Sequence, residues 1–189
     1  MNRLSVFKLL LSFVGALVTT CFLSYCSIGT AYSSTQKTTC PEGKNRFIYL
    51  TRHAEKLTDG TPNPSLSTVG IRRAKNLAQL LKTKNITLIY STNYNRTMQT
   101  AKQVAEEIKI EITIYDPSNL KSIADKLFCI NANILVIGHS NTTPALVELL
   151  GGQLQGDMLE SDYGLVYQLD IIDSEVTTRL LYSSSEMPK

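Results

Sequence analysis

The chain has few of the residues from which metal and nucleotide sites are usually built. Its 189 residues include only two histidines and four cysteines, and these show none of the spacings that hold zinc. It contains neither a Walker motif nor a glycine-rich dinucleotide fingerprint. The sequence has no run of basic residues, and its 19 basic and 16 acidic residues nearly balance. The sequence therefore predicts no metal, no cofactor and no nucleic-acid partner.

The first 31 residues have the composition of a targeting segment. Arg3 and Lys8 give a basic start, residues 9–28 are mostly apolar and uncharged, and three small residues end at Ala31. We expect residues 1–31 to be a signal peptide or, where they are not cleaved, an N-terminal membrane anchor, since the apolar stretch approaches the roughly 20 residues that cross a bilayer. This predicts an exported protein, periplasmic or otherwise extracytoplasmic, with membrane contact only through an uncleaved anchor.

One folded domain is expected over residues 46–183. Residues 32–45 are rich in Ser and Thr and read as a flexible leader, and residues 184–189 read as a tail. Within the domain, short apolar runs alternate with segments of helical periodicity. This alternation predicts an α/β three-layer sandwich with a largely parallel central sheet, helices on both faces and a C-terminal hairpin at the sheet edge.

The expected elements follow from apolar spacing and from Gly, Pro and Ser boundaries. Helices are predicted over 66–84, 95–108, 120–128 and 144–150, and strands over 47–50, 86–90, 110–115, 134–138, 164–172 and 177–183. Ser67 is the expected N-cap of the first helix, and Gly151-Gly152 the expected end of the last one. Cys40 and Cys129 each precede a predicted strand, so either a disulfide between them or two separate thiols fits the pattern.

Both histidines lie at the end of an apolar run. His53 follows the first strand directly after Arg52, and His139 follows the strand 134–138. Because the carboxyl ends of parallel strands form the ligand crevice of an open α/β sheet, we expect the two imidazoles on one rim. Arg96 falls in the first turn of the helix 95–108, where the helix dipole already favours an anion. Arginine forks bind phosphate oxygens, so the pattern predicts a phosphate site.

Four segments, taken in order and rough spacing, resemble the histidine phosphatase superfamily, the phosphoglycerate mutase-like proteins: residues 49–56, 66–70, 91–101 and 136–141. The resemblance covers about residues 46–152. It implies that His53 is a nucleophile that becomes phosphorylated, and that Arg52, Arg96 and His139 line the phosphate pocket. The short stretch between Arg96 and His139 lacks the insertion that the family's mutases carry. We therefore expect a compact, metal-independent phosphoric monoester hydrolase and not a mutase.

The proton donor for the leaving group is left open among several carboxylates. Glu55, two residues after His53, is the first candidate, because family members often carry glutamate there. Asp116, just past a predicted strand end, is the second, and three acids precede the C-terminal hairpin: Asp157, Glu160 and Asp162. Ala54 stands where glycine is commoner in the family, and Ser140 stands where glycine or alanine is frequent; both are expected to narrow the pocket.

A second function remains compatible with the same residues. An exported domain that binds phosphorylated ligands without turnover would keep the arginines, although it would gain little from a nucleophilic histidine. For either function we expect a small phosphorylated ligand, such as a sugar phosphate or an envelope glycolipid. The segment Gly138-His139-Ser140 resembles a serine-hydrolase elbow only superficially, since no histidine follows Ser140.

Overall fold

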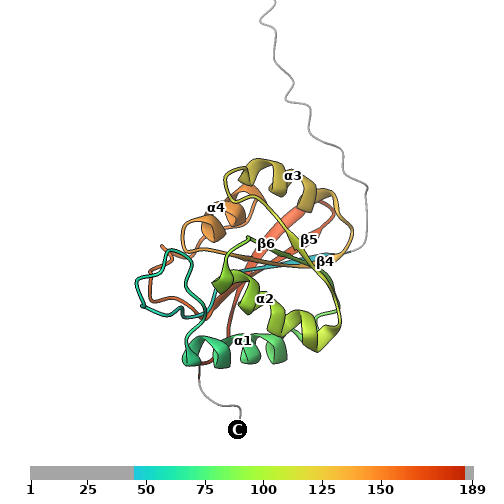
Figure 1. The fold of residues 1–189 in the computed structure, drawn as a ribbon. Helices are drawn as coiled ribbons and strands as arrows, with labels where there is room; N and C mark the ends of the chain where they lie inside the picture. Colours follow the sequence, from blue (N-terminus) through green and yellow to red (C-terminus); the bar gives the residue numbers. More distant parts are fainter. Residues whose placement is uncertain (1–44, 186–189) are drawn as a thin grey trace, which may run out of the picture. The chain divides into compact units, whose positions relative to one another are not determined.

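The computed structural model describes residues 45–185, in which strands and helices alternate. The predicted α/β sandwich is confirmed (Figure 1). In chain order the elements are β1 (Arg46–Arg52), α1 (Thr68–Leu81), β2 (Ile86–Ser91), α2 (Asn95–Ile108), β3 (Ile112–Ile114), α3 (Leu120–Cys129), β4 (Asn133–Gly138), α4 (Thr142–Leu149), β5 (Leu165–Ile172) and β6 (Glu175–Tyr182).

One six-stranded sheet has the order β3-β2-β4-β1-β5-β6. The pairs β2–β3, β2–β4 and β1–β4 are parallel, whereas β5 is antiparallel to both β1 and β6. The C-terminal hairpin therefore forms the edge of the sheet, as the sequence predicts. In the register of β1 and β4, Arg52 lies opposite Gly138, so the residues that follow these two strands emerge side by side.

Helices cover both faces of the sheet. On one face α1 and α2 pack on a cluster that includes Leu81, Ile89 and Val104; on the other, α3 and α4 pack on a cluster that includes Leu127, Val136 and Leu146 (Figure 1). Strands β1 and β4 contribute to both clusters, because successive side chains of a strand point to opposite faces. These two strands are thus held from both sides, which fixes the positions of their carboxyl ends.

Local capping fixes the start of α1 and the end of α4. Ser67 caps α1 by accepting a hydrogen bond from the backbone N–H of Gly70 at 3.1 Å. Helix α4 ends in a Schellman motif, in which Gly151 has φ +83°, Gly152 N–H donates to Val147 and Gly151 N–H donates to Glu148. Glycine adopts this left-handed conformation without a steric cost.

The start of α4 corrects the sequence prediction. The helix begins at Thr142 instead of Pro144, so Thr142 and Thr143 lie in its first turn. A proline is tolerated at that depth because the first four N–H groups of a helix have no partner within the helix. Thr143 N–H donates to the carbonyl of His139 at 2.9 Å, which ties the start of the helix to the histidine.

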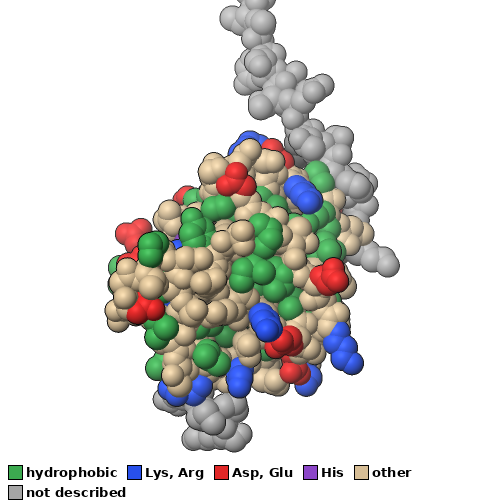
Figure 2. All heavy atoms as spheres, viewed as in Figure 1, with side chains coloured by type: hydrophobic (Ala, Val, Ile, Leu, Met, Phe, Trp, Pro, Cys, Tyr) green, Lys and Arg blue, Asp and Glu red, His purple; other side chains and the backbone are tan. Residues whose placement is uncertain are grey.

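Several predictions fall outside the described part of the chain. The signal peptide or anchor at 1–31, the leader up to residue 44 and Cys40 lie there, whereas Cys129, at the end of α3, is disulfide-bonded. Among residues 45–185, no helix has the length and apolar character to cross a bilayer. The face shown in Figure 2 carries basic and acidic side chains interspersed with small groups of hydrophobic ones.

Candidate active site

The two histidines meet where β1 and β4 end. The backbone N–H of His53 donates to the carbonyl of Gly138 at 3.0 Å, which continues the pairing of the two strands by one residue. The imidazole rings of His53 and His139 lie with their centroids 5.6 Å apart and their planes 68° to one another. The structure thus brings together two side chains that are far apart in the sequence.

The backbone fixes the tautomer of His53. Nδ1 lies 2.7 Å from the carbonyl oxygen of Ala54. A carbonyl only accepts, so Nδ1 carries the proton and the lone pair is on Nε2. Burial lowers the pKa of His53 to about 3, helped by the charges of Arg52, Arg96 and His139 and opposed by the bond to Ala54. At neutral pH the ring is therefore an uncharged nucleophile.

Arg96 lies in the first turn of α2 and faces His139. Its Nη2 donates to Nδ1 of His139 at 3.3 Å, and its Cζ lies 4.6 Å from the ring centroid of Tyr94. The buried Nε and Nη1 of Arg96 have no hydrogen-bond partner within residues 45–185. Buried N–H groups without a partner are costly, so this guanidinium is suited to receive an anion.

A chain of hydroxyl groups holds His139. Because Arg96 donates to Nδ1, the Nε2 of neutral His139 carries the proton and donates to Oγ1 of Thr92 at 2.9 Å. Thr92 donates in turn to Thr97 Oγ1, which donates to the carbonyl of Thr92. Burial lowers the pKa of His139 to about 4, with further contributions from Arg96 and Arg52. Both histidines are thus neutral at pH 7.

Arg52 is the last residue of β1 and is held by the segment before β5. Its Nη1 donates to the carbonyls of Leu159 and Glu160, and its Nη2 contacts Glu160 Oε2 at 3.0 Å. The guanidinium lies over the ring of Tyr163, with Cζ 4.3 Å from the ring centroid. Ser140 donates to the other oxygen of Glu160 at 2.5 Å.

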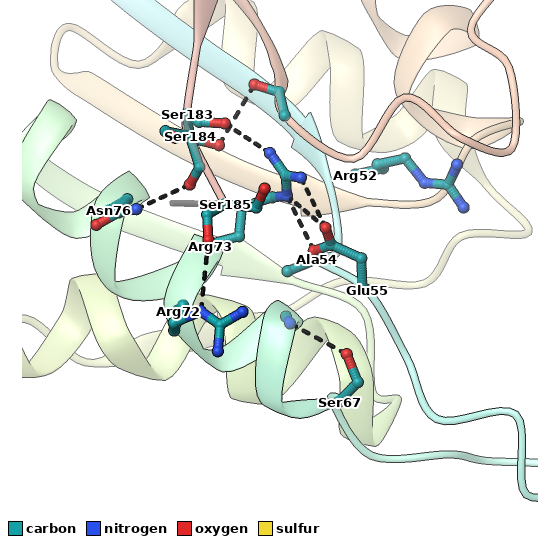
Figure 3. Close-up of polar contacts among 12 residues, drawn as sticks. Arg52, Ala54, Glu55, Ser67, Arg72, Arg73, Asn76, Ser183, Ser184 and Ser185 are labelled. Atoms are coloured by element: carbon teal, nitrogen blue, oxygen red, sulfur yellow. Dashed lines mark hydrogen bonds and ion pairs between the residues drawn. The ribbon is translucent and has the colours of Figure 1, made fainter. Parts of the chain in front are cut away.

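Glu55 does not reach the other candidate site residues. Its carboxylate accepts two hydrogen bonds from Nε of Arg73, at 3.0 and 2.9 Å, and one from Nη2 at 2.6 Å. Figure 3 shows the guanidinium of Arg52 directed away from this pair. Glu55 is not among the residues that line the cavity beside the histidines, so its placement argues against Glu55 as the proton donor.

Asp116 is also engaged elsewhere. Its Oδ1 accepts hydrogen bonds from the backbone N–H and the hydroxyl of Ser118, both at 2.8 Å, which lower the pKa of the carboxyl. Its neighbours Pro117 and Ser118 line the cavity, but Asp116 does not. Neither of the two leading acid candidates from the sequence therefore faces the histidines.

A cavity of about 470 Å³ joins these groups. Most of its walls are polar or cationic, and Glu160 is the acidic residue that lines it: Arg52, His53, Lys56, Tyr94, Arg96, Pro117, Ser118, His139, Ser140, Asn141, Thr142 and Glu160. No group of three or more His, Cys, Asp or Glu side chains within residues 45–185 is arranged to hold a metal ion. The arrangement offers a neutral nucleophile beside several cations.

Comparison with known proteins gives a family match over part of the chain. Residues 48–117, which contain β1, α1, β2, α2 and β3, match the family model of the histidine phosphatase superfamily (branch 1). Over these residues the chain is similar to the histidine phosphatase superfamily. The resemblance seen in the sequence motifs is thereby confirmed.

Curated proteins similar to this chain are named as probable phosphoglycerate mutases. GpmB of Proteus mirabilis (strain HI4320), named as a probable phosphoglycerate mutase, is 33% identical over 76 residues, which are 37% of this chain and 35% of GpmB. GpmB of Yersinia pestis (strain Pestoides F) is 38% identical over 65 residues, or 31% of this chain and 30% of that protein. The matched part spans about a third of the length of these relatives.

Solved structures share the fold. The protein histidine phosphatase SixA, in complex with tungstate, has a TM-score of 0.57 and 16% identity, covering 72% of this chain and 96% of SixA. A mycobacterial glucosyl-3-phosphoglycerate phosphatase, in complex with inorganic phosphate, has a TM-score of 0.56 and 15% identity, covering 74% of this chain and 97% of that one. At these identities the likeness is one of fold.

The sequence did not single out two aromatic side chains at the site or the acid that lines the cavity. Tyr94 and Tyr163 lie against Arg96 and Arg52, and Glu160 was only one of three acids considered before the hairpin. Residues 153–164 contain no helix or strand, so no periodicity marks them. Which of these side chains reaches the cavity is decided by the tertiary fold.

Proposed function

We propose that this protein is a phosphatase that hydrolyses phosphomonoesters through a phosphohistidine formed on His53. The observation that carries the proposal is the Nε2 lone pair of a neutral, buried imidazole that lines the same cavity as Arg96, whose buried Nε and Nη1 have no hydrogen-bond partner within residues 45–185. A phosphoryl group needs positive charge on its oxygens and a nucleophile aligned with the leaving group. The pocket supplies both.

The reaction follows in two steps. The Nε2 lone pair attacks phosphorus, the P–O bond to the leaving group breaks, and Ala54 keeps its hydrogen bond to Nδ1–H, so the ring does not rotate. Arg52, Arg96 and His139 surround the phosphoryl oxygens. Water then attacks phosphorus and the P–N bond breaks, which returns the electron pair to Nε2 and releases inorganic phosphate.

Hydrolysis is proposed in preference to phosphoryl transfer between two positions of one substrate. Between β3 and β4 the chain has only the ten-residue helix α3 with short connections, and the cavity is open to solvent on the side of Glu160, whose side chain is 77% exposed. A mutase must keep water from its phosphoenzyme, which requires a closing segment. The short connection supplies none.

The substrate class is proposed from the pocket and from the fold neighbours together. The cationic lining favours a small phosphorylated molecule, and one fold neighbour is a mycobacterial glucosyl-3-phosphoglycerate phosphatase. Export through residues 1–31 would place the substrate outside the cytoplasm, and a sugar phosphate or envelope glycolipid meets both conditions.

The test is release of phosphate from p-nitrophenyl phosphate in excess EDTA by the full-length protein. We expect turnover by the wild type, loss of at least a thousandfold in His53→Ala, and acid-labile phosphate trapped on the wild-type protein alone. Lys121→Ala, an exposed change on α3, is the control and should match the wild type. Equal rates from wild type and His53→Ala would overturn the proposal. Phosphate binding without turnover would favour the non-catalytic binding domain.

A further inference from the structure

We propose that Glu160 is the proton donor of this reaction and that its carboxylate occupies Arg52 until a substrate phosphate displaces it. The inference rests on the proposed function and assigns a residue to its unfilled role. It begins from position, since Glu160 is the carboxylate that lines the cavity within residues 45–185, whereas Glu55 and Asp116 are bound outside it.

Arg52 and Glu160 differ in how deeply their side chains are buried. The Arg52 side chain is 1% exposed and is fixed by two backbone carbonyls and the ring of Tyr163, while the Glu160 side chain is 77% exposed. Two contacts hold the carboxylate: Arg52 Nη2 at 3.0 Å and the Ser140 hydroxyl at 2.5 Å. Displacing Glu160 therefore exposes no buried charge of its own, and Arg52 keeps its place.

A phosphate dianion is suited to take over this contact. It carries twice the charge of a carboxylate and three acceptor oxygens, so it gains more from a guanidinium at the same distance. Nη2 of Arg52 is the atom whose partner must change, because Nη1 is satisfied by the carbonyls of Leu159 and Glu160. The displaced carboxylate remains on the rim of the same cavity, beside the leaving group.

The exchange also changes the protonation of Glu160. In the free protein the bonds from Ser140 and Arg52, the charge of Arg52 and the charge of Lys56 lower the pKa of its carboxyl. His53 and His139, which line the same cavity, are neutral. Losing Arg52 and gaining a dianion as a neighbour both raise the pKa. The exchange therefore favours the protonated form of Glu160 when the substrate is in place.

The proposed step balances. As Nε2 of His53 forms its bond to phosphorus, the proton of the Glu160 carboxyl moves to the bridging ester oxygen, which leaves as a neutral alcohol. In the second step the Glu160 carboxylate accepts a proton from the attacking water, so inorganic phosphate leaves and the carboxyl is restored. The same group acts as acid and then as base.

Two measurements on full-length Glu160→Gln test the inference. A proton donor matters more for phenyl phosphate than for p-nitrophenyl phosphate, whose leaving group departs without help. We expect kcat for phenyl phosphate to fall at least tenfold more than kcat for p-nitrophenyl phosphate. The inhibition constant of orthovanadate should fall several-fold, because the internal carboxylate no longer competes for Arg52. Asp157→Asn, in the same segment but outside this cavity, should change neither.

The outcomes separate this inference from the proposed function. Equal losses on both esters, or vanadate binding that is unchanged or weaker in Glu160→Gln, would overturn the role of Glu160 even where His53 is confirmed as the nucleophile. Vanadate binding that tightens in Glu160→Gln supports the displacement even where His53→Ala retains turnover, which would overturn only the phosphohistidine route.

Discussion

Two arginine–glutamate pairs flank His53, and they differ in how firmly each is held. Arg73 and Glu55 share three hydrogen bonds, and their side chains are 15% and 18% exposed. Arg52 and Glu160 share one contact between side chains, with 1% and 77% exposed. In the Arg73–Glu55 pair, which we call the closed pair, both side chains are largely buried. In the Arg52–Glu160 pair, the open pair, only the arginine side chain is buried.

The surroundings of the closed pair add to this difference. Nη1 of Arg73 donates to the carbonyl of Ser183 at 2.6 Å. From the same helix, Asn76 donates to the carbonyl of Ser184 and Arg72 to that of Ser185 (Figure 3). Helix α1, the segment after His53 and the end of the β5–β6 hairpin are thereby joined. The two pairs contain the same residue types but differ in burial and in the number of hydrogen bonds, and we expect only the exposed Glu160 to be exchangeable.

Arg52→Lys should show the largest effect on activity, because it removes the two-pronged guanidinium of the open pair and keeps its positive charge. We expect kcat/KM for p-nitrophenyl phosphate to fall about a hundredfold to a thousandfold, as for loss of one fixed donor, since an ammonium group cannot bridge two oxygens from the same position. Steady-state kinetics measure this, with Lys121→Ala as control. A loss of less than fivefold would mean that Arg52 does not bind phosphate.

Arg73→Met should break the closed pair and act mainly on stability. It leaves the Glu55 carboxylate and the Ser183 carbonyl without their partner, at a cost of about 3 kcal/mol in the free energy of unfolding. Urea unfolding measures this. In the double variant with Glu55→Met the cost should be smaller than the sum of the two single changes. Additive costs would show that the two side chains do not depend on one another.

The histidine between the two pairs offers a test by pH. The folded protein holds His53 at a pKa of about 3, against 6.5 for an ordinary histidine. The unfolded chain therefore binds more protons between these values, and stability falls as the pH falls from about 6.5 towards 3. Between pH 7 and pH 5 we expect His53 to account for a loss of about 2 kcal/mol.

Urea unfolding of the wild type and His53→Asn at both pH values measures that loss, which the variant should lack. In the free enzyme kcat/KM should stay level down to about pH 5, because both histidines remain neutral there. An activity that disappears with a midpoint near pH 6.5 would contradict the buried, neutral state of the two rings.

Glu160→Gln should give the smallest effect on stability, and it completes the comparison. An exposed partner contributes little to folding, so we expect a change within about 0.5 kcal/mol. Urea unfolding beside Arg73→Met provides the contrast. A loss comparable to that of Arg73→Met would mean that both pairs are structural and that Glu160 is not free to leave Arg52.

Much of the fold follows from local pattern. Apolar spacing places α2 at Asn95–Ile108 as observed, and Ser67 and Gly151-Gly152 mark helix ends by their intrinsic capping chemistry. Strand ends also locate His53 and His139, because a parallel sheet brings the carboxyl ends of its strands to one rim. These features depend on residues close together in the sequence.

The surroundings of the acids do not follow from local pattern. The partner of Glu55 is Arg73, 18 positions along the chain on α1, and that contact exists only once the helix has packed. Glu160 reaches Arg52 across 108 positions from a segment without periodicity. Nearness to His53 in the sequence favoured Glu55, but the direction of its side chain is set by tertiary packing.

Position 70 has a consequence for how this protein can change. A Cβ built on Gly70 would stand 2.1 Å from the carbonyl oxygen of Glu55, so the backbones of α1 and of the segment that follows His53 are in direct contact. Any side chain there must push the two apart by an ångström or more, a misplacement that can cost about a hundredfold in rate. We therefore expect a side chain at position 70 to displace His53 relative to α1, although Gly70 does not line the cavity itself.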